Sequence, residues 1–300
     1  MDNYEIYKDK ELGRGSYSIV YLGINKQNNN KVAIKEINIQ NKSSKFYEAI
    51  ENEIILIKKI MKNPHPNIVE FYDIIKTTKS IYYVMEYCDG EDLCILLKGA
   101  IKERIAKFYF TQIFEGLNYL HQNKIMHRDL KPKNILLTNN KTCIKIADFG
   151  FAKKVSSIQR CFTMCGSPLY MAPEILSRSS YGKESDFWSL GIILFEMIYG
   201  FNPFRHCTDI NDIAILSKNS RINIPPKKSN IKNISRECID LMRKLLERDD
   251  SKRITWEQSK NHIWLKEFQT INKKVNNIID SDESDNSDNE TSNCMFIMDD

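Results

Sequence analysis

The chain has 300 residues, of which 42% are hydrophobic and 28% are charged, and it carries a net charge of +5. This composition is typical of a soluble globular protein with one large domain or two lobes. The longest apolar run, residues 190–195, is too short to cross a bilayer, and the N-terminus lacks the apolar segment of a secretory signal. We therefore expect a soluble, intracellular protein, in the cytoplasm, with no membrane span.

The distribution of charge and cysteine excludes two further classes. Residues 276–300 hold eight acidic residues and no Lys or Arg, and without these eight negative charges the net charge of +5 becomes +13. The lysines are nevertheless spread along the chain beside Asn and Ile, which indicates a solvated surface and predicts no nucleic-acid partner. The eight cysteines form no CxxC pair and have no His at zinc-ligand spacing, so we expect free thiols in a reducing compartment.

The first third of the chain has the apolar alternation of strands, and the rest is mainly helical in pattern. Strands are expected over residues 4–12, 19–25, 31–39, 68–75 and 81–87. Helices are expected over residues 46–61, 101–123, 184–199 and 235–247, and a strand–loop–strand insert over 125–147. The prediction is an α+β fold with a small antiparallel-sheet lobe that carries one main helix, and a larger helical lobe.

The same pattern predicts the boundaries of these parts. The small lobe takes residues 4–85, a hinge takes 86–89, and the larger lobe takes 90–265. Residues 276–300 form an acidic tail, and its stretch SDESDNSDNETSN has the low-complexity composition of a disordered segment.

A glycine-rich turn joins the first two expected strands. Gly13 and Gly15 permit a tight hairpin whose backbone N–H groups can lie against phosphate oxygens, and the small Ser18 still allows close approach. The pattern alone is weak, because GxG is most often only a turn. Its strand–turn–strand setting argues against a dinucleotide-binding fold, where a helix follows the turn.

A lysine in the third strand is a candidate phosphate ligand. Lys35 lies in the run VAIK, so its side chain points away from those of its apolar neighbours. The helix that follows offers Glu53, which can pair with Lys35 and hold it against phosphate oxygens. Glu51 is the competing candidate, and the apolar register of the helix only modestly favours Glu53.

Two polar motifs in the larger lobe supply the groups that phosphoryl transfer needs. HRDLKPKN, residues 127–134, is followed by DFG at 148–150. The reaction needs oxygen ligands for magnesium, a carboxylate near the attacking hydroxyl and cations on the transferred group. Asp129 is expected to orient the hydroxyl, Lys131 to contact the γ-phosphoryl group, and Asn134 with Asp148 to bind the metal.

These motifs, with GRGSYSIV, APE (172–174) and DFWSLG (186–191), resemble the signature of the eukaryotic protein kinases. The resemblance covers about residues 4–265 and implies a bilobal kinase fold, ATP and Mg²⁺ as cofactors, and protein substrates. It implies a nucleotide site made by Leu12, Gly13, Arg14, Gly15, Ser16, Tyr17, Ser18, Val20, Ala33, Lys35, Glu86, Cys88 and Asp92.

The resemblance also assigns structural roles. Met85 would be the gatekeeper beside the hinge, Glu174 would pair with Arg253, and Asp186 would anchor the catalytic loop from a buried helix. The apolar column that aligns the two lobes of an active kinase would comprise Ile57, Phe71, His127 and Phe149.

Two residues indicate the serine/threonine class. Lys131 in HRDLKPKN and Ser167 on the substrate platform resemble that class and not the tyrosine kinases. A phosphate on Thr163, added by an upstream kinase, would pair with Arg128 and order the activation segment.

The stretches KIADFGFAKKV and TMCGSPLYMAPEIL are similar to the ULK kinases that initiate autophagy. We expect the chain to lack their long linker and C-terminal interaction domain, so the resemblance does not transfer the autophagy role.

Two other classes compete with an active serine/threonine kinase. A pseudokinase, acting as a scaffold or binding module, would need a replacement at Lys35, Asp129, Asn134 or Asp148, and all four are intact. A small-molecule kinase of the choline type would lack APE and the platform at Ser167. The oligomeric state is not predicted.

Overall fold

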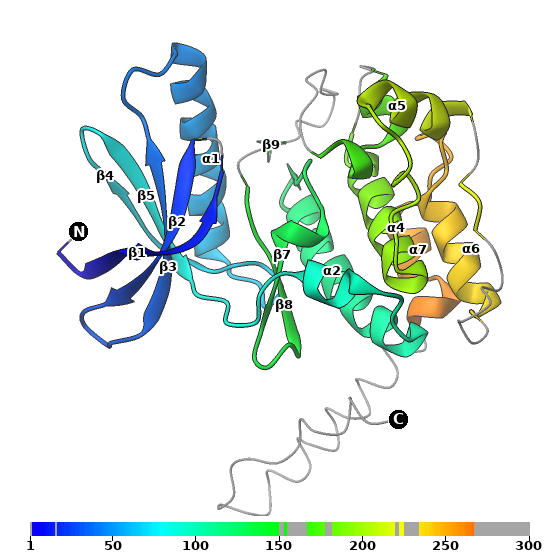
Figure 1. Cartoon of the computed structure of the whole chain (residues 1–300), viewed down its shortest axis with the longest axis horizontal. Coiled ribbons are helices and arrows are strands. Elements are labelled where there is room, and N and C mark those ends of the chain that lie inside the picture. The colour runs from blue at the N-terminus through cyan, green and yellow to red at the C-terminus, as the bar shows by residue number, and fades with distance from the viewer. Residues whose placement is uncertain are drawn as a thin grey trace, which may run out of the picture.

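The computed structural model describes residues 2–15, 17–149, 153–154, 167–177, 182–219, 222–224 and 234–266. It has two lobes, a small one built on a sheet and a larger one built on helices (Figure 1). The predicted α+β fold is confirmed, whereas the acidic tail of residues 276–300 lies outside the described residues.

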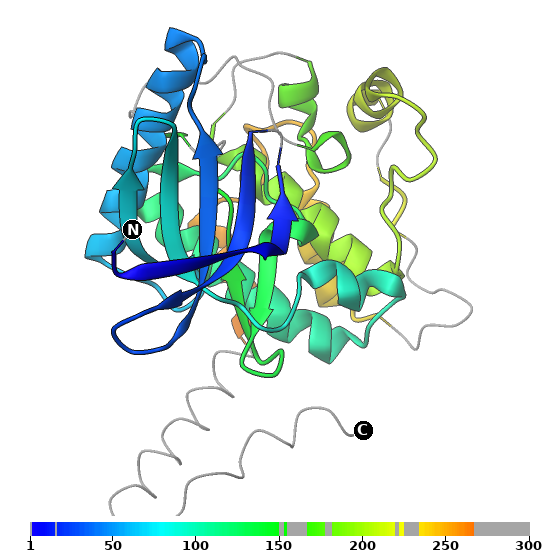
Figure 2. The same ribbon diagram turned by 60° about the vertical axis from the view of Figure 1, so that its left-hand side comes forward.

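The small lobe is a five-stranded antiparallel sheet with the strand order β1-β2-β3-β5-β4. Figure 2 shows helix α1 packed along one face of this sheet. The bounds are β1 Tyr4–Arg14, β2 Ser18–Asn25, β3 Lys31–Asn38, α1 Ser44–Lys62, β4 Phe71–Lys76 and β5 Ser80–Glu86.

Helix α1 begins two residues before the predicted helix of residues 46–61 and ends one residue after it. The Ser43 hydroxyl caps the first turn by accepting a hydrogen bond from the Phe46 N–H at 3.3 Å, and the helix ends at Lys62, just before Pro64. Ile50, Ile54 and Ile57 are buried, which places the apolar stripe in the core.

The larger lobe contains mostly helices and short strands. Its elements are η1 Leu93–Lys98, α2 Glu103–Gln122, β6 Ile125–Met126, η2 Pro132–Asn134, β7 Ile135–Thr138, β8 Cys143–Ile146, β9 Lys153–Lys154, η3 Pro168–Tyr170, α3 Pro173–Leu176, α4 Glu184–Tyr199, α5 Ile210–Asn219, α6 Arg236–Leu245 and α7 Trp256–Lys260. Strands β7 and β8 pair as a hairpin, as the insert predicts, and β6 pairs with β9.

Helix α4 is the centre of the larger lobe. It is buried on nearly every side, and a Cβ at Gly191 would lie 2.9 Å from the Cβ of Leu245 on α6, so α4 and α6 pack in close contact. The helix ends at Gly200, whose φ of 73° is the left-handed conformation that glycine adopts at low cost.

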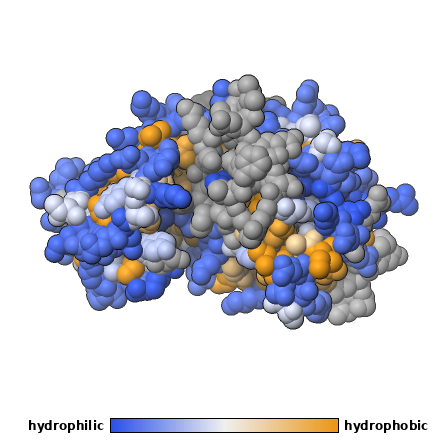
Figure 3. Space-filling model, turned by 90° about the horizontal axis from the view of Figure 1, so that it is seen from above, coloured by the Kyte–Doolittle hydropathy of each residue, from blue (hydrophilic) through white to orange (hydrophobic). Residues whose placement is uncertain are grey.

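The surface is consistent with this core. The face in Figure 3 is mostly hydrophilic, with one group of apolar side chains on the larger lobe. Among the helices in the described ranges, none combines the length and apolar character that a membrane-spanning segment needs.

Candidate active site

The loop between β6 and η2 is held in a strained conformation by a buried carboxylate. Arg128 has a φ of 70°, which costs energy in a residue that carries a side chain. The carboxylate of Asp186, at the start of α4, accepts hydrogen bonds from the backbone N–H groups of His127 and Arg128, each at 3.0 Å. Asp186 therefore anchors the loop in the way that the kinase resemblance implies.

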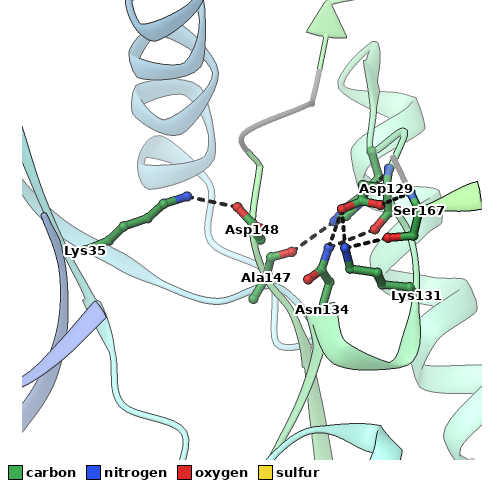
Figure 4. A network of polar contacts seen from close by, with 8 residues as sticks. Lys35, Asp129, Lys131, Asn134, Ala147, Asp148 and Ser167 are labelled. Atoms are coloured by element: carbon green, nitrogen blue, oxygen red, sulfur yellow. Dashed lines mark hydrogen bonds and ion pairs between the residues drawn. The ribbon is translucent and has the colours of Figure 1, made fainter. Parts of the chain in front are cut away.

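The anchored loop presents Asp129 to a cluster of polar groups (Figure 4). The Asp129 side chain is 3% exposed and accepts hydrogen bonds from Lys131 Nζ at 2.7 Å, the Ser167 N–H at 2.8 Å and Asn134 Nδ2 at 3.2 Å. Lys131 Nζ also donates to Ser167 Oγ at 2.7 Å. Residues 38 positions apart thus form one compact network.

Asn134 and Asp148 carry the oxygen atoms expected to bind the metal. Asn134 donates through its amide nitrogen to the backbone carbonyl of Asp129 at 2.8 Å, which turns its amide oxygen away from that carbonyl. Asp148 has a φ of 61°, a second strained backbone position close to the catalytic loop. A carboxylate and an amide oxygen are hard donors of the kind that fit Mg²⁺, which takes few protein ligands and completes its shell with phosphates and water.

Lys35 reaches this region from strand β3 of the small lobe. Its ammonium lies 2.9 Å from Asp148 Oδ1 and 3.8 Å from Glu53 Oε1. Burial alone would lower the pKa of Lys35, but the carboxylates of Asp148 and Glu53 outweigh it and raise this pKa, so the ammonium stays charged. Burial raises the pKa of Glu53, which Lys35 lowers only in part.

The structure also distinguishes between Glu53 and Glu51, the two candidate partners of Lys35 in the sequence. Glu53 is 6% exposed and faces Lys35, whereas Glu51 is on the exposed side of α1. The shorter contact of Lys35 is nevertheless with Asp148, a partner that the helix pattern does not reveal.

The glycine-rich turn closes the hairpin of β1 and β2. Gly13 pairs with Val20, and the Gly15 N–H donates to the Ser18 carbonyl at 2.8 Å. The Tyr17 ring packs edge-on against Phe46 in the first turn of α1, with 5.4 Å between ring centroids. Of the remaining residues predicted here, Leu12 is exposed, Arg14 forms an ion pair with Glu11, and Ser16 lies outside the described residues.

The expected adenine-binding residues lie where β5 leads into the larger lobe. Ala33 is buried and pairs with Met85 across β3 and β5. The Glu86 carboxylate forms an ion pair with Lys145 at 2.9 Å, a contact between the hinge and β8 that no sequence pattern indicates. Cys88 is half-buried, and burial raises the pKa of its thiol to about 12.

Asp92 accepts a hydrogen bond from the Cys94 N–H at 2.9 Å and thereby caps η1. Its observed contact is therefore structural, and the ribose role that the resemblance implies stays a prediction.

The expected apolar column is assembled across the two lobes. The ring centroids of Phe71 and Phe149 are 5.9 Å apart, and those of Phe149 and His127 are 5.7 Å apart. Ile57 is fully buried in the same core cluster. The buried ion pair of Glu174 and Arg253 is also present, with contacts of 2.7 and 3.0 Å. Thr163, the expected phosphorylation site, lies outside the described residues.

Comparison with known proteins identifies relatives of this arrangement. The family model described as a protein kinase domain matches residues 6–265. The serine/threonine-protein kinase ATG1b of Arabidopsis thaliana is 38% identical over 87% of this chain and 36% of that protein. The atg1 kinase of Dictyostelium discoideum is 39% identical over 86% of this chain and 38% of that protein.

Myosin light chain kinase A of Dictyostelium discoideum is 38% identical over 92% of both chains. In contrast, the chain spans little more than a third of the length of the ATG1-type relatives it matches. The resemblance to serine/threonine kinases, and to the autophagy-type members among them, is confirmed.

Proposed function

The chain belongs to the protein kinase family, and from this premise we propose that it transfers the γ-phosphoryl group of ATP, with Mg²⁺, to serine and threonine hydroxyls of proteins. The observation that carries the proposal is the network of Asp129, Lys131 and Ser167, which lies beside Asn134. It brings a carboxylate and a cation together beside Asn134, whose amide oxygen would bind the metal, and phosphoryl transfer needs little covalent help beyond such groups.

Each residue has a distinct part in the proposed reaction. Three donors fix the carboxylate of Asp129, so it can orient the substrate hydroxyl. As the general base, Asp129 then takes the proton of that hydroxyl. Lys131 neutralises charge that develops on the transferred phosphoryl group, and Lys35 binds the phosphates farther along the nucleotide. Asn134 and Asp148 would hold Mg²⁺, and the ion would supply positive charge to stabilise the phosphate oxygens during transfer.

An assay with labelled ATP, Mg²⁺ and a generic basic protein substrate tests the proposal. We expect transfer to serine and threonine by the wild type, and a loss of about 10²-fold or more in Asp148→Asn, which removes the charged metal ligand. Asp9→Asn makes the same chemical change at an exposed position of β1 and should leave the rate unchanged. A wild type without transfer would instead support a scaffold, and equal rates in Asp148→Asn and wild type would contradict the roles given above.

The proposal includes control through the activation segment. A phosphate on Thr163 would form charge-assisted hydrogen bonds with Arg128, whose backbone is already fixed by Asp186. We expect phosphatase treatment to lower the activity of the phosphorylated wild type and to leave that of Thr163→Ala unchanged. Equal sensitivity of the two proteins, measured as the ratio of rates before and after treatment, would place the control elsewhere.

A further inference from the structure

A series of buried and partly buried hydrogen bonds leads from helix α7 to the catalytic loop. The indole Nε1 of Trp256 donates to Nδ1 of His121 at 2.8 Å. Nε2 of His121 lies 2.6 Å from Oδ2 of Asp186, and Asp186 accepts the two backbone N–H groups that hold the loop. The side chains of Trp256, His121 and Asp186 come from α7, α2 and α4, so this series of hydrogen bonds joins three helices of the larger lobe.

The donor at one end of this series determines where the proton of His121 resides. An indole N–H is only a donor, so Nδ1 of His121 must accept and carries no proton. The proton therefore lies on Nε2, where it is donated to Asp186. Burial alone would raise the pKa of Asp186, but the hydrogen bonds from His121 and from the backbone N–H of Arg128 lower it, which keeps the carboxylate ionised and both oxygens available as acceptors.

The opposite tautomer would disturb the loop. With the proton on Nδ1, the lone pair of Nε2 would face Oδ2 of Asp186 across 2.6 Å, and two acceptors repel at that distance. The carboxylate would have to turn, which would weaken its bonds to the N–H groups of His127 and Arg128. Those bonds offset the cost of the positive φ at Arg128 that presents Asp129.

The indole is held in place by packing as well as by its hydrogen bond. Its ring centroid lies 4.6 Å from that of Phe114, 4.6 Å from that of Phe187 and 5.2 Å from that of His121. Helix α7 has only five residues, but a reciprocal capping box of Thr255 and Gln258 fixes its first turn. The N–H of Trp256 is thus presented by a rigid element.

We propose that Trp256 is a positioning residue for the phosphoryl transfer proposed above. By holding His121 in the Nε2–H tautomer it keeps Asp186 aimed at the catalytic loop, and so it acts on Asp129 without contacting substrate. The inference rests on the proposed function for its effect on rate, while the tautomer of His121 is measurable without any turnover.

Trp256→Phe separates the N–H from the ring, because phenylalanine keeps most of the packing and lacks the donor. Trp264→Phe is the matched control: Trp264 Nε1 donates to Glu103 Oε1 at 2.7 Å, and its buried ring packs on Phe110, but its carboxylate partner does not bind the catalytic loop. Both variants lose one indole hydrogen bond, so both should be destabilised in thermal unfolding.

Only Trp256→Phe should change the reaction. We expect its kcat to fall about five- to tenfold, with KM values for ATP and peptide within twofold of the wild type, and the kcat of Trp264→Phe to stay unchanged. Equal kcat values for the two variants would overturn the proposal, and so would a defect of Trp256→Phe that resides in KM alone.

The second measurement is a long-range ¹H–¹⁵N spectrum of the wild type with labelled histidine. The chain has five histidines, and a spectrum of His121→Gln identifies the signal of His121. We expect the Nε2–H pattern at His121 in the wild type and its loss or mixing in Trp256→Phe. A wild-type signal of the Nδ1–H or doubly protonated form would overturn the inference even if Trp256→Phe failed to fold. An inactive wild type with the Nε2–H pattern would remove the proposed function and leave the series of hydrogen bonds in place.

Discussion

Asp129→Asn is expected to lower kcat by about 10²- to 10⁴-fold, the usual contribution of a positioned general base. With its amide oxygen at the position of Oδ2, asparagine still accepts the hydrogen bonds from Lys131 and Asn134 and loses only the bond from the Ser167 N–H to Oδ1. The loop should keep its shape, because Asp186 holds its backbone. The amide cannot take the proton of a substrate hydroxyl. The measurement is steady-state kinetics with ATP and a peptide substrate, together with thermal unfolding of each protein.

The pattern of constants distinguishes chemistry from structure. If Asp129 acts on the hydroxyl, kcat falls while KM for ATP and the unfolding temperature stay close to those of the wild type. Asp9→Asn serves again as the control on an exposed strand. A variant that retains the wild-type kcat, or one whose loss of activity matches a loss of folded protein, would remove Asp129 from the chemical step.

Local sequence pattern was sufficient for the sheet and for the longer helices of this fold, but it did not predict helix α5, Ile210–Asn219. The helix predicted over residues 184–199 has the observed bounds of α4, because a continuous apolar run between polar residues indicates a buried helix. Strand β4 was predicted three residues too early, at 68, since Ile68 and Val69 are apolar and buried but lie before the ladder begins. Their backbone instead contacts β8 through Ile68 and Ile146.

Short helices were beyond the reach of pattern reasoning. Helix α7 has five residues and α3 has four, so neither contains two full apolar repeats. The signal that does exist for α7 is the capping box, in which Thr255 precedes Gln258 by three positions.

The contacts of the site are likewise of two kinds: those within one short motif, and those between segments far apart in the sequence. The motif at residues 127–134 places Asp129, Lys131 and Asn134 close together in the sequence, whereas the loop conformation that presents them depends on the distant Asp186. The contact of Lys35 with Asp148 joins residues 113 positions apart, and that of His121 with Asp186 joins residues 65 apart. No spacing rule predicts such pairs, because they depend on how the lobes and helices pack.

The largest expected effect on stability comes from the buried ion pair of Glu174 and Arg253, which is not part of the network around Asp129. Arg253 is fully buried on its side chain, donates to both oxygens of Glu174, and also bonds the backbone carbonyls of Glu184 and Glu247. Its guanidinium lies 5.4 Å from the ring centroid of Trp188. The pair therefore joins the segment after the substrate platform to α4 and to the loop before α7.

Arg253→Met should lower the free energy of unfolding by ~3–5 kcal/mol, since it leaves the Glu174 carboxylate buried without its cation. For a domain of this size that corresponds to a fall in Tm of about 10 °C, measurable by calorimetry. The adjacent Lys252→Met is the control: Lys252 pairs with Asp249, but its side chain is 75% exposed, so solvent replaces the lost contact and Tm should barely move.

The double variant Glu174→Met/Arg253→Met tests the cause of that loss. If the penalty arises from an unpaired buried charge, removing the carboxylate as well should recover much of the lost stability, because two apolar side chains can fill the same space. If the penalty instead arises from the carbonyls of Glu184 and Glu247, which lose their donors in both variants, the double variant should be no more stable than Arg253→Met. Recovery would show that the ion pair is costly to break and cheap to replace, so its contribution is greater to the geometry of the platform than to net stability. In that case the double variant should still show reduced phosphorylation of peptide, because Glu174 follows the segment that carries Ser167 by only seven residues.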